Sequence, residues 1–207
     1  MKTIDYEMLM NSVAEFGKEK NPNFRLSDDD KNIYSMVLMY FNEDPRFEQI
    51  SPSYTLKKGL LIRGNVGVGK TMMMKMVLDF SLARYKYRPF KIIPCHSLST
   101  EFIKNGAETI TKNTTNSFNY YSKKPVTICY DDLGAETPFS SHYSNKLNVM
   151  QMILMGRYEQ FIEVGMKTFI TTNLLREEMD ELYGYRIRSR LREMCNDIHY
   201  PGKDRRK

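Results

Sequence analysis

The segment from Gly64 to Thr71 constrains the fold of this chain more than any other feature. It reads Gly-Asn-Val-Gly-Val-Gly-Lys-Thr and fits the pattern G-x-x-x-x-G-K-[ST]. Glycines let successive backbone N–H groups turn inward around an anion, and a helix that begins here points the positive end of its dipole at that anion. The apolar run 60–62 precedes the motif, and apolar residues at helical spacing follow it. This strand–loop–helix setting favours a phosphate-binding loop over a glycine-rich turn with a stray lysine.

The loop predicts a bound nucleoside triphosphate together with Mg²⁺, and the family resemblance given below implies that the nucleotide is ATP. Lys70 is expected to place its ammonium near the β- and γ-phosphates, and Thr71 is expected to offer its hydroxyl to the metal ion. The predicted nucleotide contacts are Gly64, Asn65, Val66, Gly67, Val68, Gly69, Lys70, Thr71 and Met72.

From Gly59 onward, short apolar segments alternate with segments of helical periodicity. Such alternation predicts a parallel sheet covered by helices on both faces, here a three-layer α/β/α fold with five strands. The expected strands are 59–63, 90–95, 126–130, 167–172 and 195–200. The expected helices are 70–85, 98–108, 143–164, 175–183 and 185–193. Residues 111–124 are rich in Thr, Asn, Ser and Lys and are expected to form an exposed loop.

The first 50 or so residues have a different pattern. Apolar residues recur at helical spacing on both sides of Asn21-Pro22-Asn23, and Ser27 followed by three aspartates is typical of a helix N-terminus. We therefore expect two helices and a linker in residues 1–52, forming a small appendage that binds a partner. Residues 53–207 are expected to form the ATPase domain.

Two carboxylates follow the expected strand 126–130. A triphosphate site needs one acid to hold the Mg²⁺ shell and another group to orient or deprotonate the attacking water. Asp131 suits the first role and Asp132 the second, whereas the simpler alternative is an Asp-Asp turn before Gly134. Glu136 is close enough in sequence to assist, or it orients the loop that follows.

Asn173 ends the expected strand 167–172. An amide at that position can hydrogen-bond the γ-phosphate and the attacking water, so it would report whether the nucleotide is hydrolysed. A plain cap on the following helix is the alternative.

Composition adds broad limits. Apolar residues make up 41% of the 207-residue chain and charged residues 27%, which is an ordinary globular balance. No apolar run approaches the length of a membrane span, so a cytoplasmic protein without membrane contact is expected. The net charge of +6 weakly favours nucleic acid as a partner. The three cysteines show no metal-ligand spacing and are expected to be buried, reduced thiols.

The motifs, in this order, resemble those of the AAA+ ATPases of the DnaC/IstB group. The resemblance rests on the phosphate loop, Asp-Asp-Leu-Gly-Ala-Glu at 131–136, Thr-Thr-Asn at 171–173 and Tyr-Gly-Tyr-Arg-Ile-Arg-Ser-Arg-Leu at 183–191. It implies that Asp131 and Asp132 are the Walker B acids and that Asn173 is sensor 1. It also implies that Arg190 is an arginine finger that reaches the γ-phosphate of a neighbouring subunit, so that the chain self-associates. The alternative for Arg190 is a surface arginine on a basic helix, and Arg186 is the next candidate for the finger.

The chain departs from this family in one respect. AAA+ proteins commonly carry a helical lid with a second sensor arginine, whereas the residues after about 200 are too few for one. The lid is therefore expected to be absent or vestigial, with Arg205 as a substitute that approaches the phosphates.

Three functions are compatible with these motifs. The first is a helicase loader in DNA replication that binds the replicative helicase and single-stranded DNA, with Phe118, Tyr120 and Tyr121 as strand contacts or, alternatively, as locally packed side chains. The second is a transposition helper of the IstB type that assembles on duplex DNA. The third is an adaptor that binds ATP but hardly turns it over.

Overall fold

The computed structural model describes residues 6–86, 88–142 and 145–205. The chain divides into two compact units, each built from separate stretches of sequence. The first unit comprises residues 1–56, 65–89 and 200–207, and the second comprises residues 57–64 and 90–199. Within the described residues, no helix is both long enough and apolar enough to cross a bilayer.

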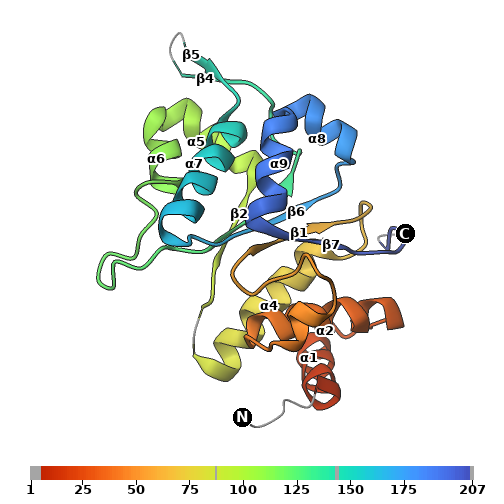
Figure 1. Ribbon diagram of the computed structural model, residues 1–207. Coiled ribbons are helices and arrows are strands. Elements are labelled where there is room, and N and C mark those ends of the chain that lie inside the picture. Colours follow the sequence, from red (N-terminus) through yellow and green to blue (C-terminus); the bar gives the residue numbers. More distant parts are fainter. Residues whose placement is uncertain (1–5, 87, 143–144, 206–207) are drawn as a thin grey trace. The chain divides into compact units, whose positions relative to one another are not determined.

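The second unit is built on a five-stranded sheet in which every pairing is parallel. The strands are β1 Gly59–Arg63, β2 Lys91–Pro94, β3 Ile128–Leu133, β6 Thr168–Thr172 and β7 Cys195–His199. Their order in the sheet is β2-β3-β6-β1-β7 (Figure 1). The five predicted parallel strands are thus confirmed, and β6 lies between the strand that precedes the phosphate loop and the strand that carries the two aspartates.

The helices of the second unit differ from the prediction at three places. They are α5 Cys95–Asn105, α6 Ala107–Asn113, α7 Val149–Val164, α8 Arg176–Tyr183 and α9 Tyr185–Met194. The expected helix 98–108 is two helices, because Gly106 adopts a φ of 56° that breaks the run. Residues 111–113, expected in a loop, belong to α6.

The expected helix 143–164 was wrong at residues 145–148, and its residues 143–144 lie outside the described part of the chain. The side chain of Asn148 accepts a hydrogen bond from the backbone N–H of Gln151 (3.0 Å) and thereby starts α7 at Val149. The preceding residues form a two-stranded antiparallel hairpin of β4 (Ser140–His142) and β5 (Asn145–Leu147).

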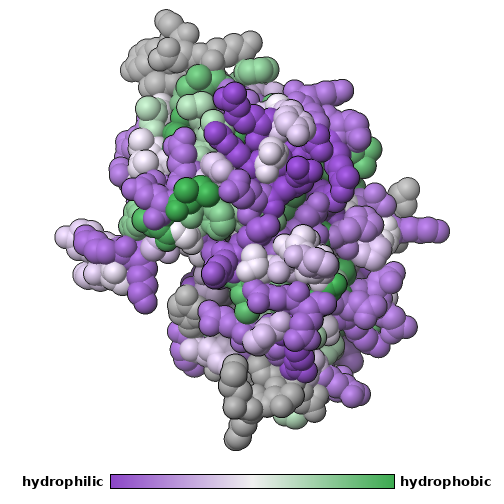
Figure 2. All heavy atoms as spheres, viewed as in Figure 1, coloured by the Kyte–Doolittle hydropathy of each residue, from purple (hydrophilic) through white to green (hydrophobic). Residues whose placement is uncertain are grey.

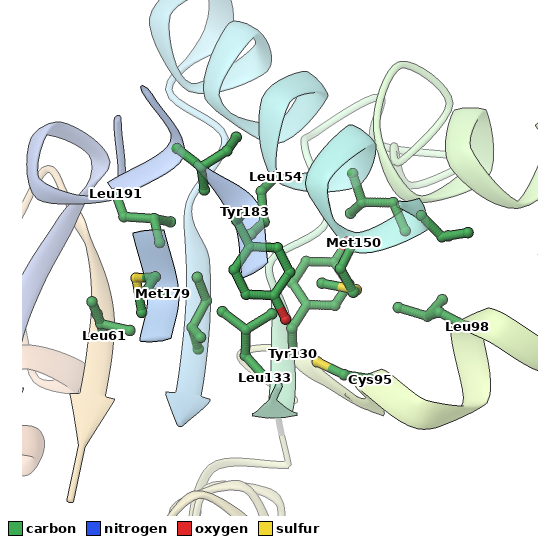
Figure 3. Close-up of a cluster of buried hydrophobic side chains, with 14 of the residues drawn as sticks. Leu61, Cys95, Leu98, Tyr130, Leu133, Met150, Leu154, Met179, Tyr183 and Leu191 are labelled. Atoms are coloured by element: carbon green, nitrogen blue, oxygen red, sulfur yellow. The ribbon is translucent and has the colours of Figure 1, made fainter. Parts of the chain in front are cut away.

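The core of the second unit lies where α5, α7, α8 and α9 pack on the sheet. Figure 3 shows Tyr130 and Leu133 of β3 directed into the same cluster as Met150 and Leu154 of α7. Nearly every side chain of β3 and β6 is buried, as expected for a parallel sheet with both faces covered. Cys95, Cys129 and Cys195 are all buried, as predicted.

The first unit contains the N-terminal helices together with the helix that follows the phosphate loop. Its helices are α1 Tyr6–Lys20, α2 Asp28–Phe41, α3 Arg46–Gln49 and α4 Lys70–Tyr85. Ser27 caps α2 through the predicted signal, in a reciprocal capping box with Asp30. Phe16 of α1 packs edge-to-face against Phe80 of α4, with ring centroids 6.0 Å apart. The domain boundary after residue 52 stays a prediction.

Candidate nucleotide-binding site

The phosphate loop has the backbone geometry that anion binding needs. Gly67 and Gly69 adopt positive φ values of 75° and 111°, which glycine tolerates without steric cost. The N–H of Met73 donates to the carbonyl of Gly69 (2.9 Å), so α4 begins directly at the end of the loop. A helix N-terminus with glycines of this geometry in front of it presents backbone N–H donors to an anion.

The side chain of Lys70 is held by the loop itself. Lys70 is only 7% exposed, and its ammonium donates to the carbonyl of Asn65 across the loop (2.9 Å). The ammonium is therefore held within the loop, where a triphosphate would take over its hydrogen bond. Thr71 is half-buried, and Met72 is exposed on the first turn of α4.

The start of the loop belongs to the sheet. The N–H of Gly64 donates to the carbonyl of Thr172 (3.2 Å), which extends β1 along β6 by one residue. In parallel sheets, ligands bind beyond the carboxyl ends of the strands. Gly64 therefore places the first residue of the loop at the edge where β3 and β6 also end.

The carboxylates at the end of β3 are held by a threonine of the neighbouring strand. The buried hydroxyl of Thr171 donates to Oδ1 of Asp131 (2.7 Å) and accepts from the backbone N–H of Asp132 (2.8 Å). Asp131 is 8% exposed, whereas Asp132 is exposed. A buried carboxylate with a fixed orientation suits a metal shell, and an exposed one suits contact with a water molecule.

Asp132 also has an unusual backbone. Its φ is 60°, in the left-handed region that non-glycine residues rarely occupy, and the strand register shifts between Tyr130 and Leu133. Aspartate tolerates this conformation better than most residues, but strain of this kind clusters at functional sites. The N–H of Ala135 donates to the carbonyl of Asp132 (3.0 Å), so a turn begins here and the alternative of an Asp-Asp turn stays open.

Glu136 is buried and orients the loop after β3. One carboxylate oxygen accepts from the N–H of Gly134 (2.9 Å), and the other accepts from the hydroxyl of Tyr183 at the end of α8. Burial and the nearby Glu136 carboxylate both raise the pKa of Tyr183, so its hydroxyl stays a donor. Sequence reasoning identified Glu136 but not Tyr183 as its partner, because 47 positions separate them.

Asn173 lies one residue beyond β6 and is exposed. The N-cap of α8 is Leu175, whose backbone N–H donates to the carboxylate of Glu178 (2.7 Å). Asn173 therefore does not cap α8, and its amide remains at the edge where β6 ends.

The arginines of α9 differ in their contacts. The guanidinium of Arg190 lies over the ring of Tyr158, 4.9 Å from the centroid, and contacts the sulfur of Met155 on α7. Arg188 forms an ion pair with Asp180 (2.7 Å), and Arg186 is exposed. Figure 2 shows that hydrophilic residues predominate over α8 and α9 on the face in view.

Arg205, expected near the phosphates, makes a different contact. Its guanidinium pairs with Asp30 of α2 (2.7 Å), and its backbone N–H donates to the carbonyl of Gly67 in the phosphate loop (3.2 Å). The backbone N–H of Arg205 thus contacts the loop, whereas its guanidinium pairs with Asp30.

Several solved structures share this fold. A crystal structure of the DnaC helicase loader is 18% identical, has a TM-score of 0.54, and matches over 87% of this chain and 95% of that chain. The chain has the fold of the DnaC helicase loader. The predicted three-layer α/β/α fold with a five-stranded parallel sheet is thereby confirmed.

Two further structures extend the likeness to DnaC. DnaI is 23% identical with a TM-score of 0.52, over 87% of this chain and 90% of that chain. A protein of Streptococcus pyogenes serotype M3, described as a primosome component, is 20% identical with a TM-score of 0.55, over 87% and 84%. No protein-family model and no curated protein sequence matches the chain.

Proposed function

We propose that this protein is an ATP-hydrolysing helicase loader that acts in DNA replication. One observation carries the proposal: a phosphate loop of binding geometry occurs in a chain whose fold matches the DnaC helicase loader and DnaI over 87% of its length. The fold alone would host many functions. The loop, the paired aspartates and the exposed tyrosines described below support an ATPase that contacts nucleic acid as the proposal among them.

In the proposed reaction, residues Gly64–Met72 bind ATP. Lys70 would neutralise charge on the β- and γ-phosphates, while Thr71 and Asp131 would hold the Mg²⁺ shell. The bound Mg²⁺ would supply charge stabilisation as the bond to the γ-phosphate breaks. The donor set fits such an ion, because hydroxyl and carboxylate oxygens are the ligands that magnesium prefers.

The remaining residues act on the attacking water and on the leaving phosphate. Asp132 orients or deprotonates the water, and Asn173 hydrogen-bonds the water and the γ-phosphate, so that ATP and water become ADP and phosphate. We assign Arg190 to a neighbouring copy's nucleotide, where a guanidinium adds positive charge to the transferred phosphoryl group. Its stacking on Tyr158 would then be exchanged for that contact on self-association.

The contact with single-stranded DNA is assigned to the segment between α6 and β3. Tyr120 and Tyr121 are 78% and 90% exposed, although the two rings also pack edge-to-face against each other with centroids 5.2 Å apart. The ammonium of Lys123 lies over the ring of Tyr120, 4.8 Å from its centroid. Figure 1 shows this segment projecting outward from the second unit. Exposed rings beside lysines provide stacking and charge for an unpaired strand.

The decisive experiment measures ATP hydrolysis by the wild-type chain and by Lys70→Ala. It is run alone, with single-stranded DNA, with duplex DNA and with the replicative helicase of the same organism. The loader proposal expects hydrolysis that Lys70→Ala abolishes, stimulation by single-stranded DNA, and capture of the helicase in a pull-down. Stimulation by duplex DNA alone would favour the transposition helper, and absence of Lys70-dependent turnover under every condition would favour the adaptor.

A further inference from the structure

A fully buried carboxylate links the N-terminal helices to the end of the chain. Asp30 of α2 is 0% exposed and accepts hydrogen bonds at both oxygens. Oδ1 accepts from the hydroxyl of Tyr200, and Oδ2 accepts from the guanidinium of Arg205 (2.7 Å). Ser27 adds its backbone N–H (2.7 Å) and its hydroxyl (2.8 Å) to Oδ2. A buried charge is tolerated only when it is satisfied in this way.

The residues held by Asp30 lie against the phosphate loop. The N–H of Arg205 donates to the carbonyl of Gly67 (3.2 Å), and the side-chain amide of Asn65 donates to the carbonyl of Gly202 (3.2 Å). A Cβ atom added to Gly67 would lie within 1.8 Å of the Asp204 carboxylate. Residues 200–205, here called the C-terminal tail, are thus in direct contact with the loop.

The tail holds the loop through one backbone carbonyl and one side-chain amide. The carbonyl of Gly67 accepts from the N–H of Arg205, and the amide of Asn65 donates to the carbonyl of Gly202. Neither contact uses a backbone N–H of the loop, the group that would donate to an anion. A loop with glycines at three of its eight positions has a large conformational entropy to lose on binding. Contacts that fix it beforehand lower the cost of binding a nucleotide.

We propose that Asp30 is a positioning residue for the phosphate loop, acting through Arg205 and the C-terminal tail. The inference rests on the proposed ATP binding and adds a coupling between α2 and nucleotide affinity. Because α2 belongs to the N-terminal helices assigned to a partner, a partner that moves α2 would change the affinity for ATP. By reciprocity, ATP would change the affinity for that partner by the same factor.

The test compares Arg205→Gln and Asp30→Asn with Asp28→Asn in the full chain. Asp28 lies on the same helix, but its side chain is 96% exposed and pairs with the exposed Lys31, so the control makes the same chemical change outside the contact. Arg205→Gln leaves the capping box of α2 intact and is the primary variant, because Asp30→Asn also weakens that cap. Binding of a fluorescent ATP analogue with Mg²⁺ gives Kd, and steady-state hydrolysis gives KM and kcat.

We expect Arg205→Gln and Asp30→Asn to raise Kd and KM roughly fivefold or more, with kcat at saturating ATP retained. The double variant is expected to bind about as weakly as the weaker single variant, because both residues act through one contact. A lower kcat with unchanged KM would indicate mere loss of folded protein and would overturn the inference. Kd values equal to that of Asp28→Asn would overturn it as well. If the wild type binds no better than Lys70→Ala, the proposed function itself has failed.

Discussion

Replacement of Thr171 by valine tests whether the hydroxyl between the two aspartates organises the catalytic end of the sheet. Valine has nearly the same shape, and Thr171 is 0% exposed, so the change removes one hydroxyl with little change in packing volume. Two hydrogen bonds are lost: the 2.7 Å bond to Asp131 and the 2.8 Å bond from the N–H of Asp132.

The magnitude follows from these two bonds. The N–H of Asp132 is part-buried, so leaving it without an acceptor costs about 1–2 kcal/mol, and a bond to a charged group contributes about 1.5–3 kcal/mol. The added methyl group recovers about 0.8 kcal/mol of burial. We expect the free energy of unfolding to fall by about 2–4 kcal/mol, measured by urea denaturation.

The effect on activity should exceed the effect on stability. Mutation of a residue that hydrogen-bonds and orients a metal ligand typically lowers metal affinity or activity by about 10–100-fold. We expect Thr171→Val to lower kcat by this factor and to raise the Mg²⁺ concentration needed for half-maximal hydrolysis.

Thr172 supplies a matched control. It is the next residue of β6, it is also 0% exposed, and its hydroxyl also makes two bonds, donating to the carbonyl of Leu133 (2.7 Å) and accepting from the N–H of Leu174 (3.1 Å). Thr172→Val should therefore lose similar stability without touching either aspartate. Equal kcat and equal Mg²⁺ dependence in the two folded variants would refute the reasoning.

Three further results are expected. Arg157→Met should lower the free energy of unfolding, measured by urea denaturation, by at least about 2 kcal/mol. The fully buried guanidinium of Arg157 donates to the carbonyls of Val126 and Lys167, and both carbonyls would lose this donor. An unchanged urea midpoint would contradict this expectation. Alanine in place of both Tyr120 and Tyr121 should weaken single-stranded DNA binding by about 2–6 kcal/mol, at about 1–3 kcal/mol per stacked base, in fluorescence anisotropy, while Kd for ATP stays the same. Burial opposes the charge of Asp30, but the hydrogen bonds from its partners outweigh it and lower its pKa. The wild type should therefore have a larger free energy of unfolding than Asp30→Asn, and this difference should be complete above about pH 4, the pKa of the unfolded chain, and shrink as the pH falls below it. A difference that grows on acidification would rule this out.

The bounds of helices and strands were predicted best where a strong local motif lies beside them. Strand β1 and helix α4 have the predicted bounds, 59–63 and 70–85, because the phosphate loop fixes where one ends and the other begins. The breaks at Gly106 and Asn148 were missed, since a glycine inside a helical pattern and an asparagine before one are each compatible with a continuous helix.

The candidate site was predictable only as a set of residue types at strand ends. Asn173 directly follows β6 as expected, whereas Asp131 and Asp132, expected after a strand ending at 130, lie within the last residues of the neighbouring β3, which ends at Leu133. The partners that orient the site could not be predicted, because Asp30 and Tyr200 are 170 positions apart and no periodicity connects them. Such contacts depend on how the chain returns to itself, which a local pattern does not encode.

The discontinuous first unit has a consequence for synthesis. Residues 65–89 carry the phosphate loop, but their contacts with residues 200–205 can form only after the last of these has left the ribosome. At about 5–20 residues per second, the delay is on the order of ten seconds. A nascent chain therefore exposes its glycine loop without support during that interval, and a chain terminated before residue 200 would retain the motif but lack the residues that hold it.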